Sequence, residues 1–281
     1  MEGLAMTTPG PTTGYAAVNG LQLYYEIHGT GQPLVLLHGA FSAIGTSFGQ
    51  MLPALAATRQ VIAVELQAHG HTADIARPLS FEHMAGDIAA LIGHLGLGTA
   101  DLCGYSLGGG VALQTAIRHP EVVRRLVILS ATYQRKGWYP EVLAGMGAMN
   151  AEAAAAMVGS PMHDAYTAAA PRPEDWSVLV EKTGQLLRQD YDWSAGVATL
   201  PMPTLIVVGD ADSVRTQHAV DMYGLLGGGQ ADGAMGGLPR AQLAILPGTT
   251  HFTILDRLDL LLPILLPFFD APLPATRPQA G

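Results

Sequence analysis

The sequence predicts an α/β protein with a mostly parallel central sheet, helices on both faces, and one helical insertion. Short apolar runs alternate along the chain with longer segments of helical periodicity. The apolar runs are continuous rather than alternating, as expected for parallel strands that are buried on both faces. Six runs are predicted to form these strands: Pro33–Leu37, Val61–Leu66, Ala100–Gly104, Arg125–Leu129, Thr204–Val208 and Gln242–Leu246.

A β-hairpin is predicted ahead of the parallel strands. Tyr15–Val18 and Leu21–Ile27 resemble strands, and Asn19-Gly20 between them is a typical two-residue turn because both residues tolerate positive φ. Helices are then predicted between the parallel strands and after the last one, at Ser47–Ala57, Ser80–Leu95, Leu107–His119, Thr216–Leu226 and Leu255–Phe269.

The alternation of strands and helices is interrupted once, between residues 133 and 200. This segment has no convincing strand, whereas Glu141–Val158 and Pro173–Gln189 have helical character. We therefore expect a flexible tail at 1–14, a core formed by 15–132 and 201–281, and a helical insertion at 133–200. The glycine-rich segment 227–237 is interpreted as a flexible surface loop.

Composition limits the classes of function. The 281 residues fit one sizeable domain, and 49% hydrophobic residues suffice for a large core. The formal net charge of −9, with no run of Lys or Arg, argues against a nucleic-acid partner and against an anionic membrane surface. The single cysteine, Cys103, excludes an intramolecular disulfide and is expected to be buried.

No targeting segment is predicted. The first residues lack a basic segment followed by an apolar stretch, so they do not resemble a secretory signal. The most apolar stretch, 258–269, is short and contains two prolines, so it is not expected to span a membrane. The expected location is the cytoplasm, and the oligomeric state is not predicted.

Gly104-Tyr105-Ser106-Leu107-Gly108 matches the pattern G-x-S-x-G. It follows a predicted strand and opens a predicted helix, which is the context that the pattern requires. Such a tight turn exposes the serine hydroxyl above the sheet, and the small flanking residues let strand and helix approach closely. Ser106 is therefore the candidate nucleophile.

A nucleophilic serine needs a base and an acid that orients the base. His251 lies in the loop after the last predicted strand, and it is the candidate base. Asp210 and Asp212 both follow the strand Thr204–Val208. We favour Asp212 as the acid and expect Asp210 to bond nearby backbone, but position alone leaves both open.

Backbone N–H groups are expected to stabilise a developing oxyanion. One is that of Leu107, directly after the nucleophile, and the other is that of Ala40 in the loop His38-Gly39-Ala40-Phe41. We interpret His38, at the end of a buried strand, as a brace for loops rather than as a catalytic residue.

In these motifs the sequence resembles the α/β-hydrolase superfamily, in the group of small serine esterases, perhydrolases and carbon–carbon-bond hydrolases. The matching segments occur in family order over about residues 15–270, and they are HGA at 38–40, ELQAHGHT at 65–72, GYSLGGG at 104–110, PTLIVVGDAD at 203–212 and GTTH at 248–251. The resemblance implies the α/β-hydrolase fold. It places Ser106, Asp212 and His251 in a catalytic triad and Ala40 and Leu107 in the oxyanion hole. Segment 133–200 corresponds to the family's cap domain.

Two departures from the family pattern stand out. Relatives often have D-x-x-G-H-G-x-S where this chain begins with Glu65, in a segment that is usually structural. Relatives also often have a proline shortly after the acid, and none follows within Ser213–Thr216, which weakens the choice of Asp212. A serine at 106 argues against haloalkane dehalogenases and epoxide hydrolases, which resemble this fold but use an aspartate nucleophile.

The expected function is serine-dependent hydrolysis of a small-molecule carboxylic ester, without a metal or other cofactor. Alternatives with the same triad are a carbon–carbon hydrolase, a lactonase or a cofactor-free perhydrolase, and a receptor-like protein with slow turnover also remains open. The natural substrate is not predicted. The residues expected to line an apolar pocket are Phe41, Tyr105, Trp138, Met146, Met162 and Phe252.

Overall fold

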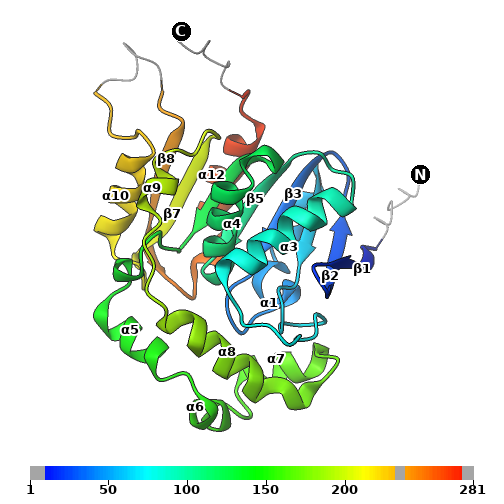
Figure 1. Cartoon of the computed structure of the whole chain (residues 1–281). Coiled ribbons are helices and arrows are strands. Elements are labelled where there is room, and N and C mark those ends of the chain that lie inside the picture. Colours follow the sequence, from blue (N-terminus) through cyan, green and yellow to red (C-terminus); the bar gives the residue numbers. More distant parts are fainter. Residues whose placement is uncertain (1–9, 232–237, 274–281) are drawn as a thin grey trace, which may run out of the picture.

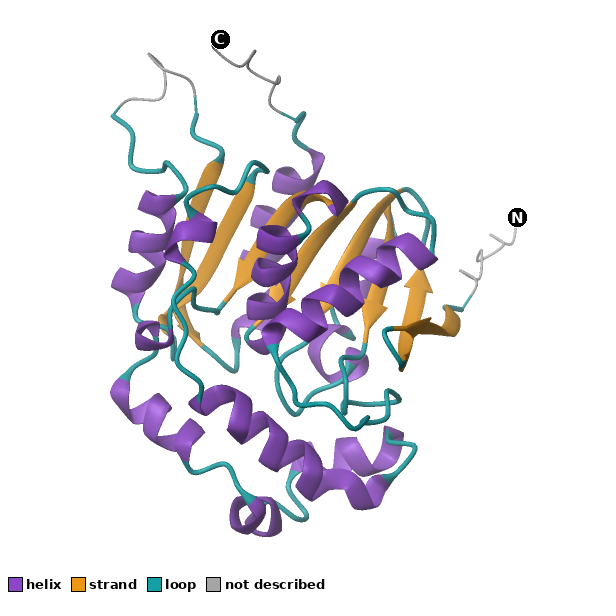
Figure 2. Ribbon diagram, in the orientation of Figure 1, coloured by secondary structure: helices purple, strands orange, loops and turns teal. Residues whose placement is uncertain are grey.

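The computed structural model describes residues 10–231 and 238–273 and centres on an eight-stranded sheet (Figures 1 and 2). The strand order is β1-β2-β4-β3-β5-β6-β7-β8, and every neighbouring pair from β4 to β8 is parallel. The strands are β1 (Thr12–Val18), β2 (Leu21–His28), β3 (Gln32–Leu37), β4 (Arg59–Val64), β5 (Ala100–Tyr105), β6 (Val123–Leu129), β7 (Thr204–Ala211) and β8 (Ala241–Thr250). The predicted parallel strands are confirmed, with β7 and β8 extending beyond their predicted ends.

The predicted hairpin is also confirmed. β1 and β2 pair antiparallel, and Asn19 and Gly20 have φ values of 48° and 81° in the turn between them. One boundary is corrected: β1 begins at Thr12, so residues 12–14 belong to the sheet and not to the tail expected at 1–14. Residues 1–9 of that tail and residues 232–237 of the glycine-rich segment lie outside the described residues.

Helices cover both faces of the sheet and give the molecule two hydrophobic core layers. One layer holds α3 (Phe81–His94), α4 (Leu107–Arg118), α9 (Ser194–Val197) and α10 (Thr216–Leu225). The other holds α1 (Ile44–Phe48), α2 (Leu52–Ala56) and α12 (Leu258–Asp270). The helix predicted at 47–57 is therefore two short helices, and the one predicted from 255 begins with a 3₁₀ turn at Ile254–Asp256.

The segment between β6 and β7 is mostly helical and lies beyond one end of the strands (Figure 2); we call it the cap. Its helices are α5 (Pro140–Gly147), α6 (Ala151–Ala156), α7 (Pro161–Ala169) and α8 (Trp176–Arg188). The sequence analysis missed α7, although Ser160 caps it by accepting a hydrogen bond from the N–H of His163. Trp176 and Val180 of α8 are buried in a small hydrophobic cluster that the cap shares with Ala68 of the core.

The cap is attached to the core by Lys182 on α8. Its ammonium group forms an ion pair with Asp74 and donates hydrogen bonds to the carbonyl groups of Ile75 and Arg77, each at 2.8 Å. These contacts fix one end of the cap above the loop that follows β4.

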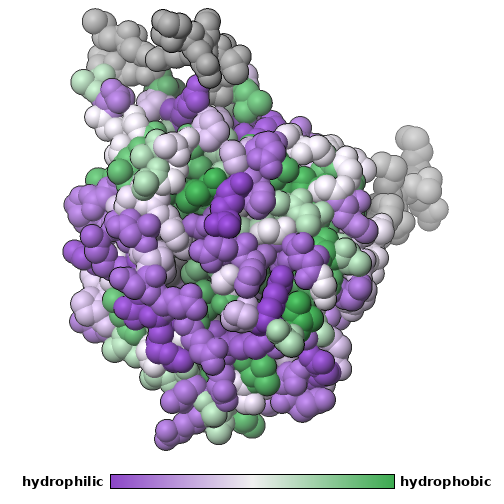
Figure 3. Space-filling view, in the orientation of Figure 1, coloured by the Kyte–Doolittle hydropathy of each residue, from purple (hydrophilic) through white to green (hydrophobic). Residues whose placement is uncertain are grey.

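Polar side chains cover most of the face in Figure 3, with hydrophobic side chains in scattered patches. Within residues 10–231 and 238–273, none of the helices has the length and hydropathy required to cross a bilayer.

The start of α4 packs unusually closely against the end of β3. A Cβ atom added at Gly108 would lie 2.1 Å from the carbonyl oxygen of Leu37 and 2.6 Å from that of His38. The N–H of Gly108 donates a hydrogen bond of 3.0 Å to the carbonyl of His38. Glycine is therefore required at 108 for the helix and the strand to meet.

We predict that Gly108→Ala lowers the free energy of unfolding by about 1–3 kcal/mol or more, because backbone rather than a flexible side chain must move. Gly86→Ala is the matched control within a helix. Its added Cβ would meet only the Asn19 amide at 3.8 Å, so this change should raise stability by about 0.5–1 kcal/mol. Urea unfolding of both variants measures the difference, and an unchanged stability of Gly108→Ala would contradict the packing argument.

Candidate active site

Ser106 occupies a strained turn between β5 and α4. Its φ of 52° and ψ of −114° lie in a region that residues with a side chain rarely adopt, at a cost of about 1–3 kcal/mol. The turn is held because the N–H of Ser106 donates to the carbonyl of Leu129 at 2.9 Å, and the N–H of Gly110 donates to the carbonyl of Ser106 at 3.1 Å. This turn lies at the carboxyl end of β5, as the sequence pattern predicts.

His251 lies directly after β8 and contacts both other predicted members of the triad. Its Nε2 is 3.0 Å from Ser106 Oγ, and its Nδ1 is 2.9 Å from Asp212 Oδ1. The hydroxyl of Tyr105 donates a 2.8 Å hydrogen bond to the carbonyl oxygen of His251 and so positions the histidine backbone. The structure therefore brings together Ser106, His251 and Asp212 in one hydrogen-bonded chain.

Asp212 is buried, and its carboxylate is fully engaged. Besides the ring of His251, it accepts hydrogen bonds from the N–H groups of Gly209 at 3.0 Å and Val214 at 3.1 Å, and from the hydroxyl of Ser130. Burial alone would raise the pKa of Asp212, but the hydrogen bond and charge interaction with His251, together with the donors Ser130 and Gly209, hold it below its ordinary value. The carboxylate is therefore ionised at neutral pH.

Asp210 is in a different environment, although it is only two residues away. It is the penultimate residue of β7, it is exposed, and it accepts hydrogen bonds from the N–H groups of Gly248 at 3.0 Å and Thr249 at 3.1 Å. Because β7 reaches Ala211, Asp210 lies in the strand and not in a turn after it. It ties the end of β7 to the segment that leads into His251.

Ser130 was not identified from the sequence. It follows β6, is completely buried, and has a φ of 49°. The parallel neighbours β6 and β7 end side by side, which places the Ser130 hydroxyl next to Asp212. The only signal in the sequence was a small polar residue at the end of an apolar run.

The predicted oxyanion donors, Ala40 and Leu107, both border the same cavity as Ser106. Within the described part of the chain, neither backbone N–H donates a hydrogen bond to another group. Leu107 is the first residue of α4, where an N–H has no partner within the helix. Both groups are therefore available to a bound ligand.

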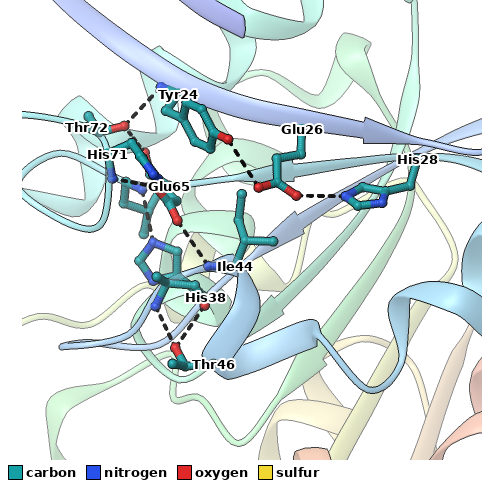
Figure 4. Close-up of polar contacts among 11 residues, drawn as sticks. Tyr24, Glu26, His28, His38, Ile44, Thr46, Glu65, His71 and Thr72 are labelled. Atoms are coloured by element: carbon teal, nitrogen blue, oxygen red, sulfur yellow. Dashed lines mark hydrogen bonds and ion pairs between the residues drawn. The ribbon is translucent and has the colours of Figure 1, made fainter. Parts of the chain in front are cut away.

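The loop that carries Ala40 is held by a buried carboxylate, Glu65. Its side chain accepts hydrogen bonds from the N–H of Ile44 at 3.3 Å and from the ring of His71 at 2.8 Å (Figure 4). His38 adds a second tie, because its Nε2 accepts a 3.0 Å hydrogen bond from the N–H of Leu66. Burial and the nearby His69 lower the pKa of His38 to about 3, so His38 is neutral and acts as a brace.

A cavity of about 650 Å³ opens above Ser106, between the sheet and the cap. All six residues predicted for the pocket line it: Phe41, Tyr105, Trp138, Met146, Met162 and Phe252. Met149 and Met157 line it as well, whereas Trp176 packs inside the cap and Trp193 packs against Phe81 and Tyr191.

No Lys or Arg side chain lines the cavity among the described residues, and Asp256 is its lone carboxylate. Over the same residues, no cluster of three or more His, Cys, Asp or Glu side chains has the arrangement of a metal site.

The different environments of the two aspartates lead to a prediction. Asp212→Asn should lower kcat by up to about 10⁴-fold, because an amide in this place favours the wrong tautomer of His251. Asp210→Asn should leave kcat within a few-fold and should lower stability only slightly, because it weakens the acceptor of the backbone N–H groups of Gly248 and Thr249. Ester-hydrolysis kinetics on both variants, after their folding has been checked by circular dichroism, measure the difference. The reverse ranking of the two kcat losses would assign the acid to Asp210.

Comparison with known proteins identifies the family of this chain. The family model described as "Alpha/beta hydrolase family" matches residues 34–262. A putative carbamate hydrolase from Azorhizobium caulinodans is 33% identical over 124 residues, which are 44% of this chain and 46% of that protein. A 2-hydroxymuconate semialdehyde hydrolase from Pseudomonas sp. (strain CF600) is 35% identical over 119 residues, which are 40% of this chain and 41% of that protein. The chain thus spans less than half the length of these two relatives.

Among solved structures, a carboxylesterase from Bacillus subtilis superposes with a TM-score of 0.70 and 18% sequence identity, over 93% of this chain and 92% of that one. At this identity the likeness concerns the fold alone. The match to the family model covers most of the sheet, the whole cap and all three residues of the hydrogen-bonded chain. The protein therefore belongs to the alpha/beta hydrolase family.

Proposed function

We propose that this protein is a serine hydrolase that cleaves carboxylic esters of small to medium neutral, apolar substrates through an acyl-enzyme. The observation that carries the proposal is the unbroken hydrogen-bonded chain from Ser106 through His251 to Asp212 at the base of an apolar cavity. A polar chain of this kind has the geometry required for nucleophilic catalysis.

The proposed reaction begins when Ser106 Oγ attacks the ester carbonyl and His251 Nε2 takes the hydroxyl proton. The ionised Asp212 holds the Nδ1 proton of His251 and stabilises the imidazolium that forms. The N–H groups of Ala40 and Leu107 stabilise the negative charge on the tetrahedral oxygen. His251 then donates its proton to the leaving alcohol, and a water molecule that it activates hydrolyses the acyl-enzyme.

The charge of the cavity supports a neutral substrate. In the part of the chain that the structure describes, its walls hold four methionines of the cap and no Lys or Arg, and the carboxylate of Asp256 repels anions. One relative is named for 2-hydroxymuconate semialdehyde, and the muconate part of that name is a carboxylate. Among the described residues, no Lys or Arg lines this cavity to pair with such a group. This favours ester cleavage over carbon–carbon cleavage of such an anion. Lactone hydrolysis and peracid formation would use the same catalytic groups.

We predict that Ser106→Ala lowers ester hydrolysis by about 10⁴-fold or more without loss of the fold. A p-nitrophenyl ester assay measures this effect, and rapid turnover by the wild type separates an enzyme from a slow receptor-like protein. A fluorophosphonate should label the wild type at Ser106, as identified by mass spectrometry, and should not label the variant. Turnover retained by the folded variant would place the nucleophile elsewhere.

We further predict that neutral acyl chains are preferred over charged ones. The kcat/KM for p-nitrophenyl hexanoate should exceed that for the matching mono-ester of adipic acid, which carries a terminal carboxylate, by about 10-fold or more. Asp256→Asn should lower the ratio of the two kcat/KM values, because it removes the charge that repels the anionic ester. The decrease should be only a few-fold because Asp256 is exposed. A higher kcat/KM for the charged ester would contradict the proposed substrate class.

A further inference from the structure

Three linked polar side chains in the cavity wall play no part in the proposed mechanism. Thr132, Trp138 and Tyr191 all line the cavity, and their polar atoms are linked. The indole Nε1–H of Trp138 donates to the hydroxyl of Tyr191 at 3.3 Å, and that hydroxyl lies 2.6 Å from Oγ of Thr132. We call these three side chains the hydroxyl relay.

The relay is held rigidly by its surroundings. The ring of Tyr191 stacks on Trp193 with a centroid distance of 4.4 Å and contacts Phe81 at 5.6 Å. Backbone hydrogen bonds join the two segments that contribute the relay, from Arg135 N–H to Tyr191 at 3.1 Å and from Trp193 N–H to Tyr133 at 2.9 Å. Thr132 itself is 1% exposed, and it borders the cavity. The relay is therefore held by packing and by backbone hydrogen bonds on both sides.

A count of donors and acceptors leaves one proton without a partner. The relay contains three donor hydrogens, one each on Trp138, Tyr191 and Thr132, but only two contacts, and the contact between the Tyr191 and Thr132 oxygens can hold only one of their two hydrogens. Among the described residues, Thr132 Oγ has no hydrogen-bond partner other than the Tyr191 hydroxyl. A buried hydroxyl proton of the relay is therefore unpaired, and an unpaired buried donor is unfavourable.

Chemistry indicates which proton is left over. A phenol is a stronger donor and a weaker acceptor than an aliphatic alcohol, so Tyr191 donates to Thr132 while it accepts from Trp138. Burial raises the pKa of Tyr191, which keeps the phenol protonated and able to donate near neutral pH. The free proton is then that of the Thr132 hydroxyl, on a wall that is otherwise mostly apolar.

We propose that Thr132 is a specificity-determining residue that donates a hydrogen bond to a second, neutral oxygen atom of the substrate, such as a keto, ether or hydroxyl oxygen. This inference rests on the proposed function and narrows its substrate class to neutral esters that carry an oxygen acceptor away from the scissile carbonyl. A purely hydrocarbon chain would leave the Thr132 proton unpaired, so it binds less well.

The test compares p-nitrophenyl hexanoate with a series of oxa-analogues, in which an ether oxygen replaces one methylene at successive positions of the acyl chain. The measured quantity is the kcat/KM ratio of each oxa-ester to hexanoate. For the wild type, one position should give a ratio about 10-fold above its neighbours, as expected for one buried hydrogen bond. Comparing the same ratio between variants cancels the inductive effect of the oxygen on the ester.

Thr132→Val removes the hydroxyl at nearly constant volume, and Thr132→Ser is the matched control that keeps it. The ratio at the preferred position should fall by about 10-fold in Thr132→Val and stay within a few-fold of the wild type in Thr132→Ser. Circular dichroism and urea unfolding establish that both variants are folded before the ratios are compared. A wild type with no preferred oxygen position, or a preference retained by Thr132→Val, would overturn the inference.

Failure of the proposed function gives a different result, because the wild type would then turn over none of these esters. In that case calorimetry on the wild type and Thr132→Val measures the affinities of heptan-2-one and of its oxa-analogues, in which an ether oxygen replaces one methylene at successive positions and which are not hydrolysed. Tighter binding of the oxa-ketone by the wild type but not by Thr132→Val supports the Thr132 site without the hydrolase. Equal binding by both proteins overturns it.

Discussion

The close contact between the start of α4 and the end of β3 is the constraint on which the rest of the site depends. Gly108 lets the helix backbone lie against the carbonyl groups of Leu37 and His38. This contact puts the N–H of Leu107 and the loop of Ala40 beside the same cavity. The same contact lies next to the strained turn at Ser106. Backbone hydrogen bonds with Leu129 and Gly110 hold this turn in a conformation that an isolated peptide would not keep.

The polar groups of the site lie where parallel strands end together. β5 leads to Ser106, β6 to Ser130, β7 to Asp212 and β8 to His251. A buried carboxylate such as that of Asp212 is unfavourable unless it is hydrogen-bonded, and the four donors around it satisfy this need. The same donors keep Asp212 charged and fixed in place, so stability and chemistry here have one physical origin.

In the proposed function, the cap supplies shape and selectivity rather than reactive groups. Its methionines adapt to varied apolar chains, whereas the relay of Trp138, Tyr191 and Thr132 places one donor at a defined point of the wall. Flexible apolar contacts and one rigid polar contact together would admit many chains but favour those with an oxygen at one position. Lys182 and Asp74 hold the cap over the core, so this wall keeps its place relative to Ser106.

The sequence by itself determined the parallel sheet, the hairpin turn at Asn19-Gly20, the helical cap and the order of the motifs that contain Ser106 and His251. These features depend on local periodicity and turn chemistry, which neighbouring residues express directly. The sequence left Asp210 and Asp212 open and did not reveal Ser130 or the relay. Tertiary structure decided these because the relevant contacts join residues far apart in the chain: Ser130 meets Asp212 only since β6 and β7 are neighbours, and Thr132 meets Tyr191 only since the cap folds back onto the core.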